Sequence, residues 1–456
     1  MHKYLILIIF VLSLASCTNE DVYIDPLDED VYLGGETSIE GFFINIFQQP
    51  ASNLSQEELT LHLKSDQAFA DIFVSAPSTH NSGLGPVFNQ VSCEHCHVAN
   101  GRSPFPSNTD NLRGLLFRIS KPGEDEMGGP LAVDNFGTQL QTKANFGIEA
   151  EGKVDWSYSY IVGNYPDGNE FMLKNRIFRI YDTYMPWEFT NLISPRIAPP
   201  VFGLGLLEAI PEEQILLYAD PEDIDNDGIS GKANIVWSVT DHTFKLGRFG
   251  WKAGQPSLIQ QTAGAYHQDM GLTSPLFPKE SCENQTQADD YSDDPEIDLE
   301  LMKITTFYAQ SLGVPIRRNF EDDQVKEGKK LFRKLNCNAC HREAFVTGDQ
   351  SDKPFLNNQK IFPYTDLLLH DMGDGLADFR PEFVANGYEW RTPPLWGIGF
   401  TKIVGGENAN YLHDGRATTL EEAILWHGGE AEESKQSFKN LTKSERNAMI
   451  KFLENL

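Results

Sequence analysis

Positive charge is scarce in this chain of 456 residues. Lysine and arginine together number 37 against 66 aspartates and glutamates, which gives a formal net charge of −29. No basic cluster offsets this excess, so the sequence excludes a nucleic-acid-binding protein and a protein drawn to an acidic membrane surface. The acidity favours solubility, and it also suits the attraction of a basic protein partner.

Long hydrophobic runs are also scarce, and the one candidate opens the chain. The stretch MHKYLILIIFVLSLASC has one early lysine, a short apolar run and small residues before Cys17, and it resembles a bacterial lipoprotein signal. The run is short for a bilayer-spanning helix, which disfavours a membrane anchor, and an ordinary signal peptide is the other alternative. We expect a signal peptide at 1–16, lipid on Cys17 and an acidic, flexible tether at 17–58. The protein is then exported to the bacterial cell envelope and lipid-anchored, at the periplasmic face or the cell surface.

Cysteine is the third scarce residue, with six in the chain, and four of these lie in CEHCH (93–97) and CNACH (337–341). A redox dithiol does not need the histidine, and a zinc site could use two cysteine pairs plus histidine. Covalent haem needs both thiols for its vinyl groups and the adjacent histidine as axial iron ligand. Because both copies carry that histidine in an exported chain, the favoured interpretation is two haem c groups, held by Cys93, Cys96, His97, Cys337, Cys340 and His341.

Apolar spacing predicts helices on both sides of the second motif. Apolar residues recur at near-helical spacing over 325–335, directly before CNACH. At the end of the chain, Thr442 and Glu445 form a capping-box pattern ahead of an apolar stripe. A helix before the motif and a closing helix are typical of a cytochrome c domain.

Two further segments occur twice in the same order. APPVFGLGL (198–206) matches TPPLWGIGF (392–400), and FGWKAGQPSL (249–258) parallels HDGRATTL (413–420). Each copy follows its own CxxCH motif, so the simplest account is two related mono-haem units, the first with large insertions. We expect a mainly α fold with two cytochrome-c-like haem domains, at 59–312 and 313–456, and long loop insertions.

These motifs together resemble a known family. The segments RIAPPVFGLGLLEAIPEEQIL, DIDNDGISGKANIV, GRFGWKAGQPSLIQQ and LLLHDMGDGLAD are similar to the bacterial di-haem oxidoreductase family, often labelled thiol oxidoreductase. RTPPLWGIGF and YLHDGRATTLEEAILWHGGEA also resemble the related di-haem cytochrome c peroxidases and the enzyme that matures methylamine dehydrogenase. The resemblance spans about 60–456 and implies an electron-transfer haem in the C-terminal domain and a peroxidatic haem in the N-terminal one.

The resemblance also implies axial ligands. In the peroxidases the electron-transfer haem takes its second ligand seven residues after the leucine of DGRxxxL, which places His427 here. Relatives have methionine or tyrosine at that place, and bis-histidine ligation with His341 implies a low potential. Met372 is the rival ligand, while His370 and His413 are candidates for hydrogen-bonding support. The iron ligands expected are therefore His97, His341 and His427.

At the N-terminal haem the resemblance implies a distal site. Gln261, three residues after Leu258, matches a glutamine that would hold peroxide by hydrogen bonds. The family's glutamate has no strict counterpart, and Asp269 is the nearest carboxylate for moving a proton between peroxide oxygens. His267 is an alternative base, or a sixth ligand that blocks the haem. All three could instead be ordinary polar residues at a helix end.

The chain departs from the peroxidases between the haems. Phe249 takes the place of a tryptophan that relays oxidising equivalents, and Trp251 follows two residues later. The relay is therefore in doubt, unless the two-residue insertion moves Trp251 into position.

A calcium site is a separate expectation. DIDNDGISGKAN places Asp223, Asp225 and Asp227 at alternate positions before Gly228, a pattern that suits Ca²⁺. Position 12 is Asn234 rather than glutamate, so the loop is not a full EF-hand. An acidic turn closed by Asp-Gly is the alternative.

These observations predict an exported di-haem c-type oxidoreductase of peroxidase type. Electrons from a small c-type cytochrome would pass from the C-terminal haem to an oxidant such as hydrogen peroxide at the N-terminal haem. The alternatives are a pure electron-transfer di-haem cytochrome c lipoprotein and a haem enzyme that oxidises a protein partner.

Overall fold

The computed structural model describes residues 29–289 and 294–456. The signal peptide and lipidated Cys17 expected from the sequence lie outside these residues. Helix makes up 28% of the structure and strand 18%, so the prediction of a mainly α fold is wrong. Within the described residues, no helix is both long enough and apolar enough to cross a bilayer.

Short helices and two-stranded sheets alternate along the chain. The α-helices are α1 (Gln56–Ala70), α2 (Cys93–Cys96), α3 (Leu204–Glu208), α4 (Glu212–Leu216), α5 (Leu258–Met270), α6 (Leu299–Ser311), α7 (Asp323–Lys334), α8 (Thr401–Gly405), α9 (Leu420–Trp426), α10 (Glu432–Lys439) and α11 (Lys443–Leu453). The strands are β1 (Val87–Phe88), β2 (Leu115–Ser120), β3 (Lys143–Ala144), β4 (Lys153–Asn164), β5 (Glu170–Tyr181), β6 (Leu192–Ile197), β7 (Ile235–Ser238), β8 (Thr243–Leu246), β9 (Phe345–Val346), β10 (Lys360–Ile361), β11 (Leu369–Asp371) and β12 (Glu389–Arg391). Short 3-10 helices include η4 (Val98–Asn100), η5 (Cys337–Ala339) and η7 (Ile398–Phe400). The strands pair antiparallel as β1–β3, β2–β6, β4–β5, β7–β8, β9–β10 and β11–β12.

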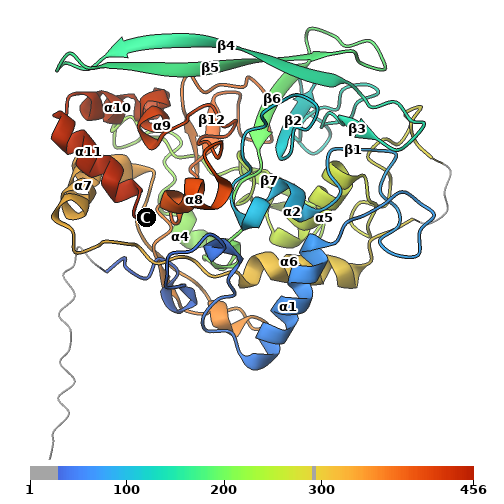
Figure 1. Cartoon of the computed structure of the whole chain (residues 1–456), viewed down its shortest axis with the longest axis horizontal. Coiled ribbons are helices and arrows are strands. Elements are labelled where there is room, and N and C mark those ends of the chain that lie inside the picture. The colour runs from blue at the N-terminus through green and yellow to red at the C-terminus, as the bar shows by residue number, and fades with distance from the viewer. Residues whose placement is uncertain (1–28, 290–293) are drawn as a thin grey trace, which may run out of the picture.

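The long β4–β5 hairpin is the main reason that the helical prediction fails. Both strands are rich in aromatic and β-branched residues, which favour a pleated conformation, and a Pro-Asp-Gly turn separates them. The hairpin runs across the top of the molecule in Figure 1. Near its turn, Tyr165 Oη donates to Glu421 Oε1 at 2.7 Å, and Arg446 pairs with Asp167 at 2.7 Å. The insertion in the first half of the chain is thus fastened to α9 and to α11.

The two helices expected around the second CxxCH motif are confirmed. Helix α7 begins after Asp322, whose carboxylate accepts the backbone N–H groups of Gln324 and Val325. Helix α11 begins with the predicted Thr442–Glu445 capping box. The two helices pack closely at Gly328, where an added Cβ would lie 2.1 Å from the carbonyl oxygen of Ala448. A glycine is required there because the helix backbones touch.

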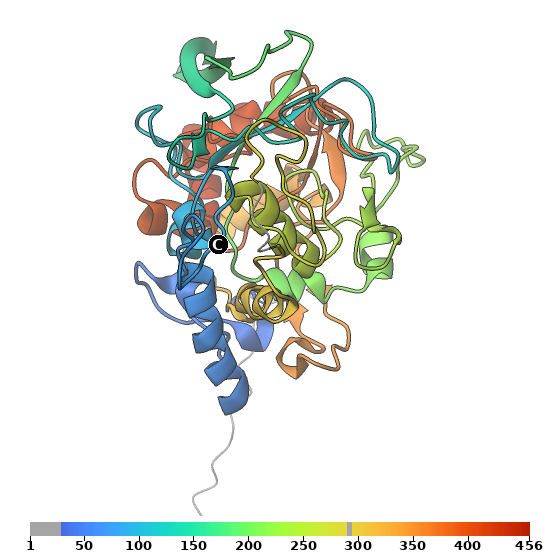
Figure 2. The same ribbon diagram turned by 90° about the vertical axis from the view of Figure 1, so that its right-hand side faces the viewer.

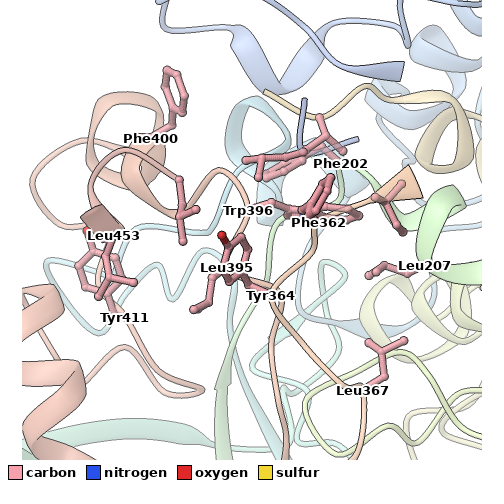
Figure 3. Close-up of a cluster of buried hydrophobic side chains, with 14 of the residues drawn as sticks. Phe202, Leu207, Phe362, Tyr364, Leu367, Leu395, Trp396, Phe400, Tyr411 and Leu453 are labelled. Carbon is pink, nitrogen blue, oxygen red and sulfur yellow. The ribbon is translucent and has the colours of Figure 1, made fainter. Parts of the chain in front are cut away.

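The repeated APPVFGLGL and TPPLWGIGF segments adopt matching conformations. Gly203 and Gly397, at equivalent positions, both have left-handed backbone, with φ of 71° and 69°. Each glycine packs against the aromatic ring of the other copy: a Cβ on Gly203 would meet Trp396, and one on Gly397 would meet Phe202. Figure 3 shows Phe202 and Trp396 together in the core. The two repeats therefore face each other in a reciprocal arrangement at the centre of the molecule.

One large hydrophobic cluster joins the two halves of the chain. It contains buried residues from Leu33 to Leu456, including members of both predicted haem domains. The sequence predicts an acidic tether over 17–58, and within this range Leu33, Ile46 and Phe47 are buried in the cluster. Figure 2 shows the described part of this segment, in dark blue, beside α1.

Candidate haem site

The first CxxCH motif forms the short helix α2. Ser92 caps it, accepting the N–H of His95 at 3.3 Å, and His97 follows as the C-cap residue. The Nδ1 atom of His97 lies 2.7 Å from the carbonyl oxygen of Pro199. Pro199 belongs to the first APP repeat, so the repeat segment supports the histidine of the motif.

The second motif follows α7 and forms the 3-10 helix η5. The Nδ1 atom of His341 lies 2.9 Å from the carbonyl oxygen of Tyr364. Tyr364 is fully buried and has a positive φ of 55°, which is unusual for a bulky residue. The surrounding packing must therefore hold this carbonyl in place.

His427 is the third histidine with this arrangement. It ends α9, and its Nδ1 atom lies 2.7 Å from the carbonyl oxygen of Ala423, one helical turn earlier. His427 acts electrostatically on His341, so the two imidazoles lie near each other.

All three histidines are held as neutral imidazoles with a free Nε2 lone pair. Burial lowers the pKa of His97 and of His341 to about 4, and it also lowers the pKa of His427. Because Nδ1–H donates to a carbonyl, the lone pair is on Nε2, as metal-ligating histidines require.

The four cysteines of the motifs are uncharged thiols. Burial raises the pKa of Cys93 and of Cys337 to about 12, and it raises the pKa values of Cys96 and Cys340 as well. A redox-active dithiol needs a lowered pKa, so this environment disfavours a redox dithiol at either motif. In the described residues Cys340 converges with Asp366 and His370, and no group of converging ligand atoms contains two cysteines. This arrangement disfavours a zinc site built from the two cysteine pairs.

A cavity of about 720 Å³ connects the two motifs. The residues lining it include both CxxCH motifs and the third histidine: Cys93, Cys96, His97, Cys337, Cys340, His341 and His427. Met372 also lines the cavity and stays the rival candidate for the second iron ligand.

The predicted distal residues separate into two groups on α5. Gln261 and Asp269 line the cavity, and Asp269 acts electrostatically on the thiols of Cys93 and Cys96. Burial raises the pKa of Asp269, although Arg118 and the hydrogen bond from Gln139 at 2.7 Å oppose this. His267 points elsewhere, with Nε2 2.9 Å from the carbonyl oxygen of Lys279 and its ring stacked on Phe277.

Comparison with protein families agrees with this geometry. The family model described as "Di-haem oxidoreductase, putative peroxidase" matches residues 31–456. The chain belongs to this di-haem oxidoreductase family. No curated protein matches the sequence. Membership makes haem the cofactor of the site, and the residues fit it, because the cavity is bordered by neutral imidazoles with free Nε2 atoms and by two pairs of uncharged thiols.

Two further histidines of this di-haem oxidoreductase, His370 and His413, also line the cavity. The two ring nitrogens of His370 contact Asp366 at 2.8 Å and Glu430 at 2.6 Å. Burial lowers the pKa of His370, but Asp366 and the other contacts raise it well above its usual range, so the ring is cationic. His413 is buried and stacks on Trp390 with ring centroids 3.7 Å apart.

Phe249 and Trp251 both line the cavity. The indole Nε1 of Trp251 donates to the carbonyl oxygen of Ile197 at 2.8 Å, and its backbone carbonyl accepts from Arg391. The indole is therefore fixed at the cavity wall. A role for Trp251 as an electron relay between the haems stays a prediction.

The predicted calcium loop is an exposed acidic turn. Asp223 and Asp225 converge with Asp220, whereas Asp227 accepts the N–H of Ile229 at 2.8 Å. Asp223 and Asp225 also accept backbone N–H groups of the loop, as in an ordinary Asx turn. Calcium binding by Asp223, Asp225 and Asp227 stays a prediction.

Cys282 is buried near Glu280, away from the lining of the cavity.

Some functional contacts were missed by sequence reasoning. Backbone carbonyls hold all three histidines, and no residue type reveals a carbonyl's direction. Strands β2 and β6 bring Arg118 and Arg196 to the cavity wall, and Glu382 pairs with Arg196 at 2.8 Å. The only signal in LLFRIS is a single arginine within an apolar strand, and it does not show that Arg118 faces a pocket.

Replacing His427 with methionine should raise the midpoint potential of the C-terminal haem, by on the order of 0.1 V within the ~0.8 V span that axial ligands cover. A thioether stabilises ferric iron less than an imidazole does. Redox titration with optical detection would follow both haems, and the N-terminal one should keep its potential. If His427→Met leaves both values unchanged while Met372→Leu moves one, Met372 is the ligand.

Proposed function

We propose that this di-haem oxidoreductase binds two covalent haem c groups and uses electrons entering at the C-terminal site to reduce an oxidant such as hydrogen peroxide at the N-terminal site. The observation that supports this best is the single cavity bordered by both CxxCH motifs, three Nε2-free histidines and, on α5, Gln261 and Asp269. Bound haem iron supplies the one-electron chemistry.

The protein's own residues have distinct tasks in this proposal. His97 binds iron at the N-terminal site, and His341 with His427 binds it at the C-terminal site. The amide of Gln261 holds the peroxide by hydrogen bonds, and Asp269 moves a proton from one peroxide oxygen to the other. The reaction consumes one peroxide, two protons and two electrons from two reduced small c-type cytochromes, and it releases two waters. Such basic donors suit the net charge of −29.

Export and attachment belong to the same proposal. The apolar start of the sequence and Cys17 support a lipid-anchored protein of the bacterial cell envelope, and covalent haem c suits such a compartment. Calcium in the 223–227 loop would be a structural addition, without a task in the reaction.

The deciding experiment is peroxide-dependent oxidation of a reduced small cytochrome c by purified holo-protein. Turnover supports the peroxidase. A protein that shows no turnover and stays wholly low-spin, even when half-reduced, is an electron carrier. A protein with a high-spin haem but no peroxide turnover is better explained as an oxidase of a protein partner.

Gln261→Ala should lower peroxide turnover about 10²-fold, and Asp269→Asn by about 10²–10⁴-fold, with haem content unchanged. Because Asp269 acts as a base only when ionised, the rate should fall as pH decreases through its pKa, which lies above the ordinary 3.8. His267→Gln is the matched comparison on the same helix and should retain activity, since its ring contacts Lys279 and Phe277. A larger loss in His267→Gln than in Asp269→Asn would exchange the roles of these two residues.

A further inference from the structure

Arg102 is a buried cation at the wall of the haem cavity. It follows η4, five residues after His97, and its side chain is 8% exposed. The guanidinium lies over the indole of Trp251, 5.0 Å from the ring centroid. Among the residues that the structure describes, Nε and Nη2 of Arg102 meet no hydrogen-bond acceptor.

The carboxylates around the cavity are already engaged by other groups. Asp414 accepts from Arg416 at 2.9 Å, Glu382 pairs with Arg196 and Arg380, and Asp269 accepts from Gln139. Asp414 and Tyr411 act on Arg102 only as nearby charges, and burial lowers the pKa of Arg102 to about 10. A buried guanidinium without an acceptor is costly, because desolvation is not offset by hydrogen bonds.

We propose that Arg102 binds a carboxylate group of a haem propionate in this cavity. The proposal rests on the proposed function, which places two haems there. The planar fork of arginine matches a carboxylate with two parallel hydrogen bonds, and the unpartnered Nε and Nη2 form one edge of that fork. The guanidinium also lies over the ring of Trp251, and this cation–π contact holds it in place. Either haem could supply the carboxylate, since Arg102 follows the first motif in sequence while Tyr411 and Asp414 belong to the C-terminal half.

The test is the pH dependence of both midpoint potentials in Arg102→Gln and in the unaltered holo-protein. In the variant the propionate loses its cation, so it should take up a proton on reduction, and one potential should acquire a slope approaching one proton per electron near neutral pH. The haem that acquires the slope is the one that Arg102 holds. Arg102→Lys keeps the charge without the fork and should give a smaller slope; it provides the same measurement if the glutamine variant does not accumulate.

Neighbouring groups do not mimic this result. Burial raises the pKa of Tyr411 to about 12. Burial also acts to raise the pKa of Asp414, but Arg416, His413 and Arg176 together hold it below the ordinary value, so neither group titrates near neutrality. Arg248→Gln is the matched control, since Arg248 is a buried arginine bonded to the carbonyls of Leu207 and Ile210, outside the cavity lining. Unchanged potentials and slopes in both Arg102 variants would overturn the proposal. Haem content of the unaltered protein is measured separately, because fewer than two covalent haems would contradict the proposed function itself.

Discussion

A protein in which Cys93 and Cys96 are both replaced by alanine should carry one covalent haem, against the two that we expect in the unaltered protein. Each thiol of a CxxCH motif forms a thioether with one vinyl group, so the loss of both removes every covalent bond at that site. The second motif, at Cys337 and Cys340, has its own histidine and its own supporting carbonyl at Tyr364. Haem per protein, measured from the pyridine haemochrome spectrum, should therefore fall by half, and the intact mass should fall by one haem.

The control for this experiment is Cys282→Ala, which removes a buried thiol outside both motifs and should leave two haems in place. Peroxide turnover should disappear in the double alanine variant, because Gln261 and Asp269 would no longer face a haem. Retention of two covalent haems would exclude the first motif from haem attachment. Loss of both haems would show that the two sites mature together.

The parts that could be predicted from sequence are those encoded by near neighbours. The CxxCH motifs, helix α7 and the Thr442–Glu445 capping box each depend on residues a few positions apart. The repeats were recognisable because both copies need a glycine with positive φ at the same place, as found at Gly203 and Gly397. Such features depend on local backbone conformation and residue spacing, so they can be recognised in the sequence itself.

The parts that could not be predicted depend on contacts between distant residues. The hairpin β4–β5 has local signals in its aromatic and β-branched composition and its Pro-Asp-Gly turn, but the haem motifs by themselves predict helices and carry no sign of this insertion. The support of His97 by Pro199 and of His341 by Tyr364 joins residues 102 and 23 positions apart through backbone atoms. A backbone carbonyl has the same chemistry at every residue, so sequence carries no sign of which one is used.

A buried charge cluster links the N-terminal segment to the second motif. Asp30 is 1% exposed, and its carboxylate lies 2.8 Å from Arg317 Nη2 and 2.7 Å from Lys329 Nζ. The hydroxyl of Tyr364 donates to the same carboxylate. Since the carbonyl of Tyr364 is the partner of His341, Asp30 is two contacts from this proposed iron ligand. The acidity of this segment suggests a solvated tether, yet Asp30 is buried and pairs with two buried cations.

Asp30→Ala should lower the free energy of unfolding by about 3–5 kcal/mol, because it removes a buried carboxylate that forms ion pairs with Arg317 and Lys329 and accepts a hydrogen bond from Tyr364. The midpoint potential of the C-terminal haem should also rise, since the loss of a nearby negative charge disfavours ferric iron. Urea denaturation of the holo-protein measures the first effect and redox titration the second. The N-terminal haem, supported through Pro199, should keep its potential.

Glu29→Gln is the control, because it removes a neighbouring negative charge that is not buried. Glu29 pairs with Lys360 at 2.6 Å, and both side chains are more than half exposed. A surface pair of this kind is screened by solvent, so the change in stability should be small and the potentials should not move. Tyr364→Phe separates charge from geometry, as it removes the hydroxyl bond to Asp30 and retains the carbonyl that holds His341. We expect that variant to lose about 1–3 kcal/mol while the potential moves less than in Asp30→Ala. If Asp30→Ala behaves like Glu29→Gln in both measurements, the buried cluster does not position the C-terminal haem, and His341 depends on the local packing of Tyr364 alone.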